Sequence, residues 1–359
     1  MSVRPLFCAC ILFLLLLFTQ CEKGKPVAVV RAFYYWKSAE WYGINYESDQ
    51  VLSRLKVGKL YVKMFEVEPS NLMGPIPAAK TGLRSLPRRA DSVHYTQEIV
   101  PVIFIRDEAL TGLSPQGVDS LADNINFLTN KYLDRMHNGG YVEHEPYLYR
   151  ELQLDCDWTE KNKSSYFSLL KILKTKSGKR ISCTLRLYPF KFRERMGIPP
   201  VDRAMLMCYN LLNPVANVDK NTILSTKELE AYLGRRRDYP VPLDIALPAW
   251  SQAQLYRYDH FVQTVHADDI TYASVLKRIK PYWYEVLHDT TIGDAYIRAG
   301  DLIKYESVSA ADLLKTVALL RSHINLPDTV TVAYFHLDES LLNRYTYETL
   351  DSVYRSFGR

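Results

Sequence analysis

Residues 153–159 read Gln-Leu-Asp-Cys-Asp-Trp-Thr, a strand-like run that ends in two carboxylates and an aromatic side chain. In an extended strand alternate side chains share a face, so Asp155 and Asp157 point one way and Trp158 the other. Acidic side chains at the end of an otherwise apolar strand are costly unless they are paired, solvated in a cleft or used in chemistry. The run therefore predicts a buried strand that ends at an ion-paired or functional edge.

Seven further runs are rich in Val, Ile, Leu, Phe and Tyr, as buried parallel strands require. The eight predicted strands span residues 27–36, 59–68, 98–107, 151–159, 180–190, 203–210, 242–250 and 329–338. Apolar residues at helical spacing predict helices over 118–136, 164–174, 309–324 and 340–357, and Ser225 with Glu228 predicts a capped helix start. Strands and helices in alternation predict an α/β fold, a (β/α)8 TIM barrel.

An open doubly wound sheet is the alternative architecture, and it is disfavoured because no Gly-rich phosphate loop follows the first strand. The barrel pattern is interrupted between strands 7 and 8 by an irregular insertion at residues 251–308. Within it, residues 283–287 and 295–305 flank a turn-rich segment at 289–294, which predicts a hairpin. We expect one barrel domain over residues 22–359 that carries this insertion.

The first 21 residues have the pattern of an export signal. Arg4 supplies the positive start, and residues 6–18 are almost wholly apolar but too short for a comfortable membrane span. Cys21 directly follows, as in a bacterial lipoprotein signal, where cleavage precedes the cysteine and the cysteine carries the lipid. We expect a lipid-anchored protein of the bacterial cell envelope, periplasmic or on the outer-membrane surface; the alternative is an ordinary secretory signal.

Charge and composition limit the function classes. The net charge of +5 argues against a dedicated nucleic-acid binder. Cys156, Cys183 and Cys208, an odd number after the signal, argue against a disulfide framework and are expected to be buried hydrophobes. The histidines show no zinc-binding spacing, and no cofactor or metal is predicted. The 26 tyrosines suit sugar rings, because tyrosine combines a flat apolar face with a hydroxyl.

Active sites of such barrels lie at the carboxyl ends of the strands. These ends carry carboxylates, aromatics and arginines, which is the composition of a carbohydrate cleft. In strand order they are Tyr34, Tyr35 and Trp36; Glu66 and Glu68; Arg106 and Asp107; Asp155 and Asp157; Arg186 and Tyr188; Tyr209 and Asn210; in the less regular seventh strand, Asp244 early and Trp250 late; and His336 and Asp338. Arg186 is also placed to pair with either acid of the fourth strand, which is the structural alternative for those carboxylates.

Three of these segments resemble chitinase-like glycoside hydrolases of family 18. Tyr35 and Trp36 resemble the aromatic close of that family's first strand. Asp155-Cys156-Asp157-Trp158 on strand four resembles its Asp-x-x-Asp-x-Asp-x-Glu signature, and Met207-Cys208-Tyr209-Asn210 on strand six its Met-x-Tyr-Asp/Asn signature. The chain also resembles bacterial lipoproteins that carry such a barrel. The resemblance implies that Asp157 orients a substrate acetamido group, with Asp155 as its inner partner.

The resemblance further implies that Tyr209 and Asn210 contact the acetamido group. Two positions depart from the signature: Thr159 stands where the family has its general acid, and Leu152 where it has the first aspartate. Threonine cannot protonate a leaving group at neutral pH. We therefore expect a barrel that binds a glycan without the standard chitinase acid. The alternatives are a glycoside hydrolase with a rearranged carboxylate pair, with Asp157 and Asp155 as candidates, and a non-catalytic envelope assembly protein.

The expected substrate-binding residues lie around one mouth and are Trp36, Tyr35, Glu66, Arg186, Tyr209, Asn210, Trp250 and Asp338. If the protein is a hydrolase, Glu66, Glu68 or Asp338 could supply the second carboxyl group, because two carboxyls about 5–10 Å apart across a cleft suffice for glycoside hydrolysis.

Overall fold

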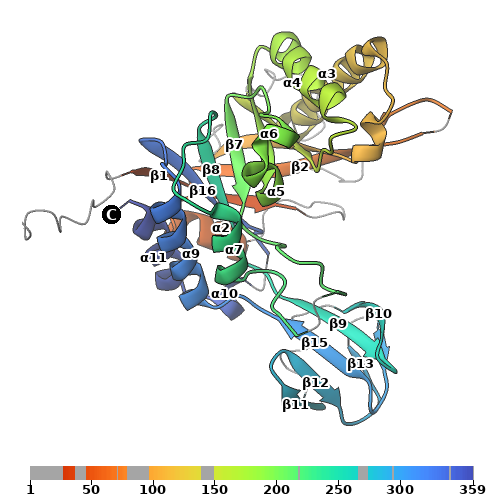
Figure 1. Cartoon of the computed structure of the whole chain (residues 1–359), viewed down its shortest axis with the longest axis vertical. Coiled ribbons are helices and arrows are strands. Elements are labelled where there is room, and N and C mark those ends of the chain that lie inside the picture. Colours follow the sequence, from red (N-terminus) through yellow and green to blue (C-terminus); the bar gives the residue numbers. More distant parts are fainter. Residues whose placement is uncertain are drawn as a thin grey trace, which may run out of the picture.

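Eight parallel strands close into a barrel in the computed structural model of the chain (Figure 1). They are β1 (Ala28–Tyr35), β2 (Lys59–Glu68), β4 (Glu98–Ile105), β5 (Glu151–Cys156), β6 (Arg180–Arg186), β7 (Arg203–Met207), β8 (Leu243–Pro248) and β16 (Thr329–Phe335). Each strand pairs in parallel with its neighbours in this order, and β1 pairs with both β2 and β16, which closes the ring. The predicted (β/α)8 barrel is confirmed.

The structure describes residues 27–36, 46–70, 72–78, 97–138, 149–216, 219–265, 274–292, 295–338 and 341–358. Cys21 and the export signal lie outside them. In the stretches that the structure describes, no helix combines the length and the apolar content needed to cross a bilayer.

Helices connect the strands and cover the outside of the barrel (Figure 1). They are α2 (Tyr46–Arg54), α3 (Pro115–Asn138), α4 (Lys163–Ser177), α5 (Leu187–Lys191), α6 (Arg193–Met196), α7 (Thr226–Leu233), α9 (Ala310–His323), α10 (Leu341–Arg344) and α11 (Tyr347–Phe357). The predicted cap at Ser225 is present, since its hydroxyl accepts a hydrogen bond from the Glu228 N–H and so satisfies a free donor of the first turn. The predicted helix over 340–357 is two helices, α10 and α11.

Strand alternation produces two apolar layers. One set of side chains packs between the barrel and its helices, and includes Phe33, Tyr35, Leu154, Cys156, Cys183 and Cys208. The other set fills the barrel interior and includes Tyr34, Tyr61, Val102, Met205 and Tyr209. The three cysteines are free and buried, as the alternation predicted.

A buried polar network occupies the amino-terminal half of the barrel interior. Lys59 Nζ donates to Glu151 Oε2 at 2.9 Å, and the Ser182 hydroxyl donates to Glu151 Oε1 at 2.6 Å. The carboxamide of Gln153 donates to Ser182 at 3.4 Å and accepts from the Tyr34 hydroxyl at 2.6 Å. Because every member has a partner, the network links four strands without leaving an isolated buried charge.

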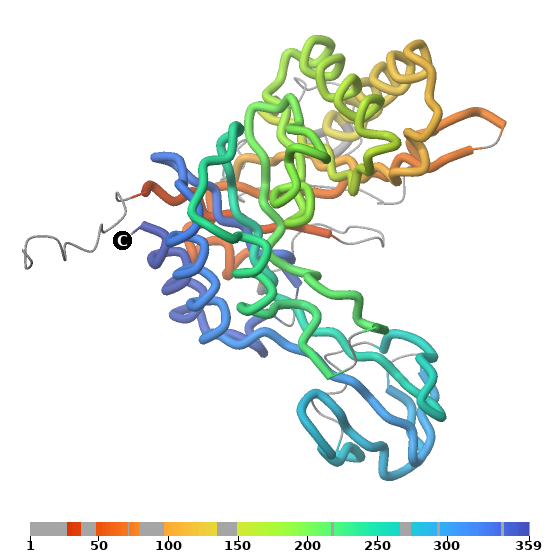
Figure 2. The backbone as a smooth tube through the Cα atoms, in the orientation of Figure 1, coloured from red at the N-terminus to blue at the C-terminus, as the bar shows by residue number. Residues whose placement is uncertain are grey.

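The insertion is more elaborate than the predicted hairpin. It forms a five-stranded antiparallel sheet in the order β10-β9-β15-β12-β11 and a hairpin of β13 (Thr290–Ile292) and β14 (Ala295–Ile297). The sheet strands are β9 (Gln252–Arg257), β10 (His260–Val265), β11 (Leu276–Lys280), β12 (Trp283–Val286) and β15 (Leu302–Glu306). In Figure 2 the insertion projects away from the barrel. It has its own apolar core.

The first hairpin of this sheet escaped prediction because of its turn. Tyr258 and Asp259, between β9 and β10, both have positive φ, of 51° and 62°. Such a two-residue turn matches the twist of a hairpin, but it is usually built from Asn-Gly or Asp-Gly, and Tyr-Asp carries no such signal. The prediction of a single hairpin in the insertion therefore missed the five-stranded antiparallel sheet.

Candidate functional site

An aromatic cluster forms the floor of the barrel mouth. Phe335, the last residue of β16, lies at its centre, with its ring centroid 5.7 Å from that of Trp36 and 5.3 Å from those of Tyr209 and Trp250. Tyr209 and Trp250 also meet edge to face at 4.9 Å. The structure thus brings together three predicted site residues from β1, β7 and β8. Phe335 was not predicted, because it looks like any other apolar residue of a buried strand.

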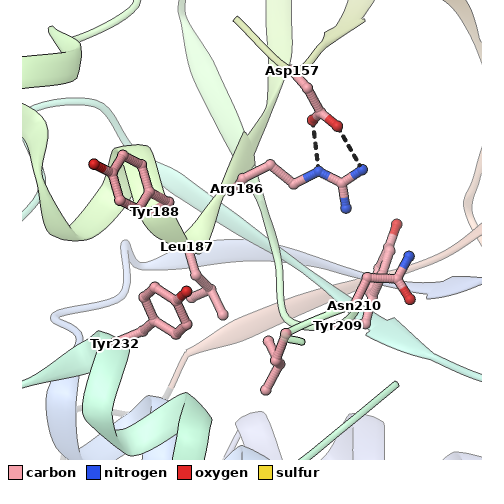
Figure 3. Close-up of a pocket in the computed structure, with 8 residues that line it drawn as sticks. Asp157, Arg186, Leu187, Tyr188, Tyr209, Asn210 and Tyr232 are labelled. Carbon is pink, nitrogen blue, oxygen red and sulfur yellow. Dashed lines mark hydrogen bonds and ion pairs between the residues drawn. The ribbon is translucent and has the colours of Figure 1, made fainter. Parts of the chain in front are cut away.

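Asp157 and Arg186 form a two-point ion pair at one side of this mouth. Arg186 Nε donates to Asp157 Oδ1 at 2.6 Å, and Nη2 donates to Oδ2 at 3.1 Å (Figure 3). Burial opposes the charge on Arg186, but the hydrogen bonds to Asp157 outweigh it and raise the pKa of the guanidinium. Both carboxylate oxygens of Asp157 are therefore engaged by one guanidinium fork.

Asp155 lies deeper than Asp157 and is held differently. The Thr184 hydroxyl donates to Asp155 Oδ1 at 2.6 Å. Desolvation raises the pKa of Asp155 to about 6, although the nearby charge of Arg186 and the Thr184 hydrogen bond act in the opposite direction. The arginine expected to satisfy this acid pair therefore binds Asp157 directly and affects Asp155 only through its charge.

Three more of the predicted carboxylates, Glu66, Glu68 and Asp338, are paired with cations. Glu66 is bound by Lys63 and lies 3.4 Å from Arg106, whose Nε lies 3.6 Å from Glu68. Asp338 receives two hydrogen bonds from Arg344, at 3.0 and 2.8 Å. Lys63 also lies 5.2 Å above the Trp36 ring. Each of these three acids thus has a cationic partner in the structure.

A pocket of about 270 Å³ opens beside the Asp157–Arg186 pair. Its lining comes from the ends of β5, β6 and β7 and from α5 and α7, and consists of Asp157, Arg186, Leu187, Tyr188, Tyr209, Asn210, Leu211 and Tyr232. Figure 3 shows Arg186 and Asn210 on one side and Tyr188 and Tyr232 on the other. The pocket therefore has a polar wall and an aromatic wall, as ligand sites that orient a small molecule commonly do.

Five of the predicted strand-end residues, Asp157, Arg186, Tyr188, Tyr209 and Asn210, line this pocket. Tyr35 does not reach the mouth, because strand alternation directs it into the layer between the barrel and its helices. Thr159 lies beyond the end of β5, where its N–H donates to the Asn162 side chain at 2.8 Å. Tyr232 was not predicted, because it belongs to helix α7 and the predicted site residues all come from strand ends.

Among the described residues there is no group of three or more His, Cys, Asp or Glu side chains that could hold a metal ion.

No protein-family model matches the chain, and neither does any curated protein sequence. Similar solved structures include a xylanase and α-amylase inhibitor protein in complex with trehalose, with 10% identity, a TM-score of 0.41 and coverage of 92% of this chain and 97% of that one. A Pyrococcus furiosus chitinase domain with chito-oligosaccharides has 14% identity, a TM-score of 0.38 and coverage of 93% and 96%. A GH113 β-1,4-mannanase has 8% identity, a TM-score of 0.43 and coverage of 92% and 99%. At these values none of the three indicates a ligand or an activity for this chain.

Proposed function

We propose that the protein binds a glycan at the carboxyl-terminal mouth of the barrel and does not hydrolyse it. The observation that carries this proposal is the pocket beside Asp157 and Arg186, with its polar wall facing an aromatic wall. A sugar ring presents an apolar face that packs on tyrosine and a rim of hydroxyls that needs donors and acceptors. The pocket volume of about 270 Å³ suits one substituted ring.

The ion pairs support binding rather than hydrolysis. Glycoside hydrolysis needs one carboxylic acid that can protonate the leaving group and a second carboxylate across the cleft. Asp157 is held by Arg186, Glu66 by Lys63 and Asp338 by Arg344. Asp155 supports the alternative of a rearranged hydrolase, because its pKa of about 6 is that of an acid close to working pH.

The polar wall suits a sugar that bears an N-acetyl group. Asp157 offers an acceptor, and within the described part of the chain Arg186 Nη1 makes no hydrogen bond and points into the pocket (Figure 3). An acetamido group presents the complementary pair, an N–H donor and a carbonyl acceptor. N-acetylated chitin oligomers are therefore expected to bind more tightly than their deacetylated counterparts.

Tyr188→Ala tests the aromatic wall. Tyr188 is 42% exposed, and its one ring contact among the described residues is a tilted one with Phe192, so the fold should tolerate its loss. We expect about a tenfold weaker affinity, about 1.4 kcal/mol, for whichever sugar the wild type binds. The measurement is titration calorimetry of the chain without residues 1–21 against chitin oligomers, peptidoglycan fragments and N-glycans.

Tyr258→Ala is the matched control, because Tyr258 is 86% exposed and lies in the insertion, away from the pocket lining. Equal loss of affinity in both variants would count against the proposed site. Release of reducing ends by the wild type, abolished in Asp157→Ala, would establish the hydrolase instead. Neither binding nor release for any of the sugars would favour the envelope assembly protein.

We also propose that Cys21 carries a lipid that anchors the protein in the bacterial envelope. The support is the apolar segment followed directly by cysteine and by the polar stretch 22–25. In Cys21→Ala the protein is expected to move from the membrane fraction to the soluble fraction of a bacterial host. The same membrane content in the variant and the wild type would show that the anchor is elsewhere.

A further inference from the structure

Glu306 is a fully buried carboxylate at the end of β15, where the insertion returns to the barrel. Its Oε1 accepts the Thr222 N–H at 2.6 Å and lies 3.1 Å from Lys304 Nζ. Its Oε2 accepts the Thr222 hydroxyl at 3.0 Å and the Gln252 carboxamide. Burying a carboxylate away from water costs free energy. Both oxygens of Glu306 are compensated by hydrogen bonds, and Oε1 also by the Lys304 ammonium.

Thr222 connects this carboxylate to the pocket. The loop after β7 leaves the barrel at Asn210 and Leu211 and returns to them at Thr222 and Ile223. The Asn210 N–H donates to the Ile223 carbonyl at 2.9 Å, and the Leu211 N–H donates to the Thr222 carbonyl at 3.1 Å. Both Asn210 and Leu211 line the pocket. Glu306 therefore lies one residue contact away from the pocket wall.

The backbone of Asn210 is left-handed, with φ of 53°. Asparagine adopts this conformation more readily than other residues with a Cβ, and the surroundings of Asn210 select it here. The described contacts that fix it are main-chain hydrogen bonds to a segment that Glu306 in turn holds.

Gln252 extends the same contact to the other side of the mouth. It lies two residues after Trp250, whose ring packs on Tyr209 and Phe335 in the aromatic floor. The carboxylate thus ties the loop after β7, the exit from β8 and the end of the insertion together.

We infer that Glu306 is a positioning residue of the pocket: it fixes Asn210 and Leu211 through Thr222, and so sets ligand affinity without touching the ligand. The effect of Glu306 on ligand affinity rests on the proposed function. Its effect on the position of Asn210 and Leu211 does not. Through Glu306 the insertion thus stabilises one wall of the pocket.

The test compares Glu306→Gln with Asp301→Asn. Asp301 is a buried carboxylate of the same insertion that receives two hydrogen bonds from Arg257, at 2.9 and 2.6 Å, and one from the Arg298 N–H at 2.9 Å, and neither of these residues lines the pocket. Both variants lose one buried charge pair, so both should unfold at a lower temperature than the wild type. Only Glu306→Gln should loosen the pocket wall.

Two readouts separate positioning from general destabilisation. In hydrogen exchange of the native protein, the amides of Asn210 and Leu211 are expected to exchange about tenfold faster in Glu306→Gln and at the wild-type rate in Asp301→Asn. Sugar affinity is expected to fall about tenfold in Glu306→Gln alone. Thr222→Val removes only the hydroxyl donor and provides a milder variant if Glu306→Gln does not fold, with smaller changes in the same direction.

Equal exchange at Asn210 and Leu211 in the two variants would overturn the inference. Faster exchange with unchanged affinity would overturn the link to the ligand. If the wild type binds none of the sugars, the proposed function fails, while the exchange rates still decide whether Glu306 positions the wall.

Discussion

Replacing Glu151 with glutamine is expected to lower the free energy of unfolding by about 3 kcal/mol. Glu151 is 2% exposed and accepts hydrogen bonds from Lys59 and Ser182 inside the barrel. Glutamine keeps the shape but removes the negative charge, so the buried ammonium of Lys59 is left with Glu98, 3.8 Å away. Urea unfolding of the chain without residues 1–21, followed by circular dichroism, measures the change.

The double variant Lys59→Met/Glu151→Leu is the control for this prediction. When both charges are replaced by apolar groups of similar size, the desolvation cost of each disappears together with their attraction. We expect the double variant to recover most of the stability lost in Glu151→Gln. If Glu151→Gln lowered the free energy of unfolding by less than about 1 kcal/mol, Glu98 or water would be stabilising the charge of Lys59 instead.

The barrel could be predicted because its strands are apolar and alternate with segments of helical spacing. The predicted strand over 59–68 has the bounds that the structure gives to β2. Errors occurred at the carboxyl ends, where the pattern runs on after the strand has stopped: β5 ends at Cys156, and the residues after Arg186 form helix α5. The polar and apolar alternation continues past Cys156, and an apolar run continues past Arg186, so only hydrogen bonding reveals the boundary.

The site was harder to predict than the fold because it depends on register. Strand parity placed Asp155 and Asp157 on one face and Arg186 within reach of both. The register of β5 against β6 pairs Leu154 with Cys183, and the side chains that follow bring Thr184 to Asp155 and Arg186 to Asp157. A shift of the register would have exchanged these partners, and no residue type in either strand signals which register forms.

Site residues outside the strands could not be predicted from strand periodicity. Tyr232 reaches the pocket from α7, and Glu306 reaches Thr222 across more than 80 residues of sequence. Such contacts depend on how loops and the insertion pack against the barrel. The periodicity of one sequence describes which face of an element is buried, and it does not describe what the element is buried against.

Asp155→Asn is expected to change how stability depends on pH. The pKa of Asp155 rises from 3.8 to about 6 in the native barrel, mainly through desolvation, so the native state holds this proton more tightly than the unfolded chain does. The stabilisation from this group is therefore complete below about pH 4 and is lost as pH rises through 6. At pH 8 the native barrel must keep a carboxylate in a poorly solvated position, which asparagine avoids while still accepting the Thr184 hydrogen bond.

The measured quantity is the free energy of unfolding of Asp155→Asn minus that of the wild type, at pH 4 and at pH 8. We expect this difference to be about 2 kcal/mol more favourable to the variant at pH 8, because two pKa units correspond to roughly 3 kcal/mol before allowance for partial exposure.

For Asp202→Asn the same difference in the free energy of unfolding should change with pH in the opposite direction. Burial raises the pKa of Asp202, but the Lys174 ammonium and the Ile181 N–H outweigh it and lower the pKa, so its carboxylate stabilises the fold at neutral pH. A pH-independent difference for Asp155→Asn, beside a clear response of Asp202→Asn, would show that Asp155 titrates normally and would remove the support it gives to a rearranged hydrolase.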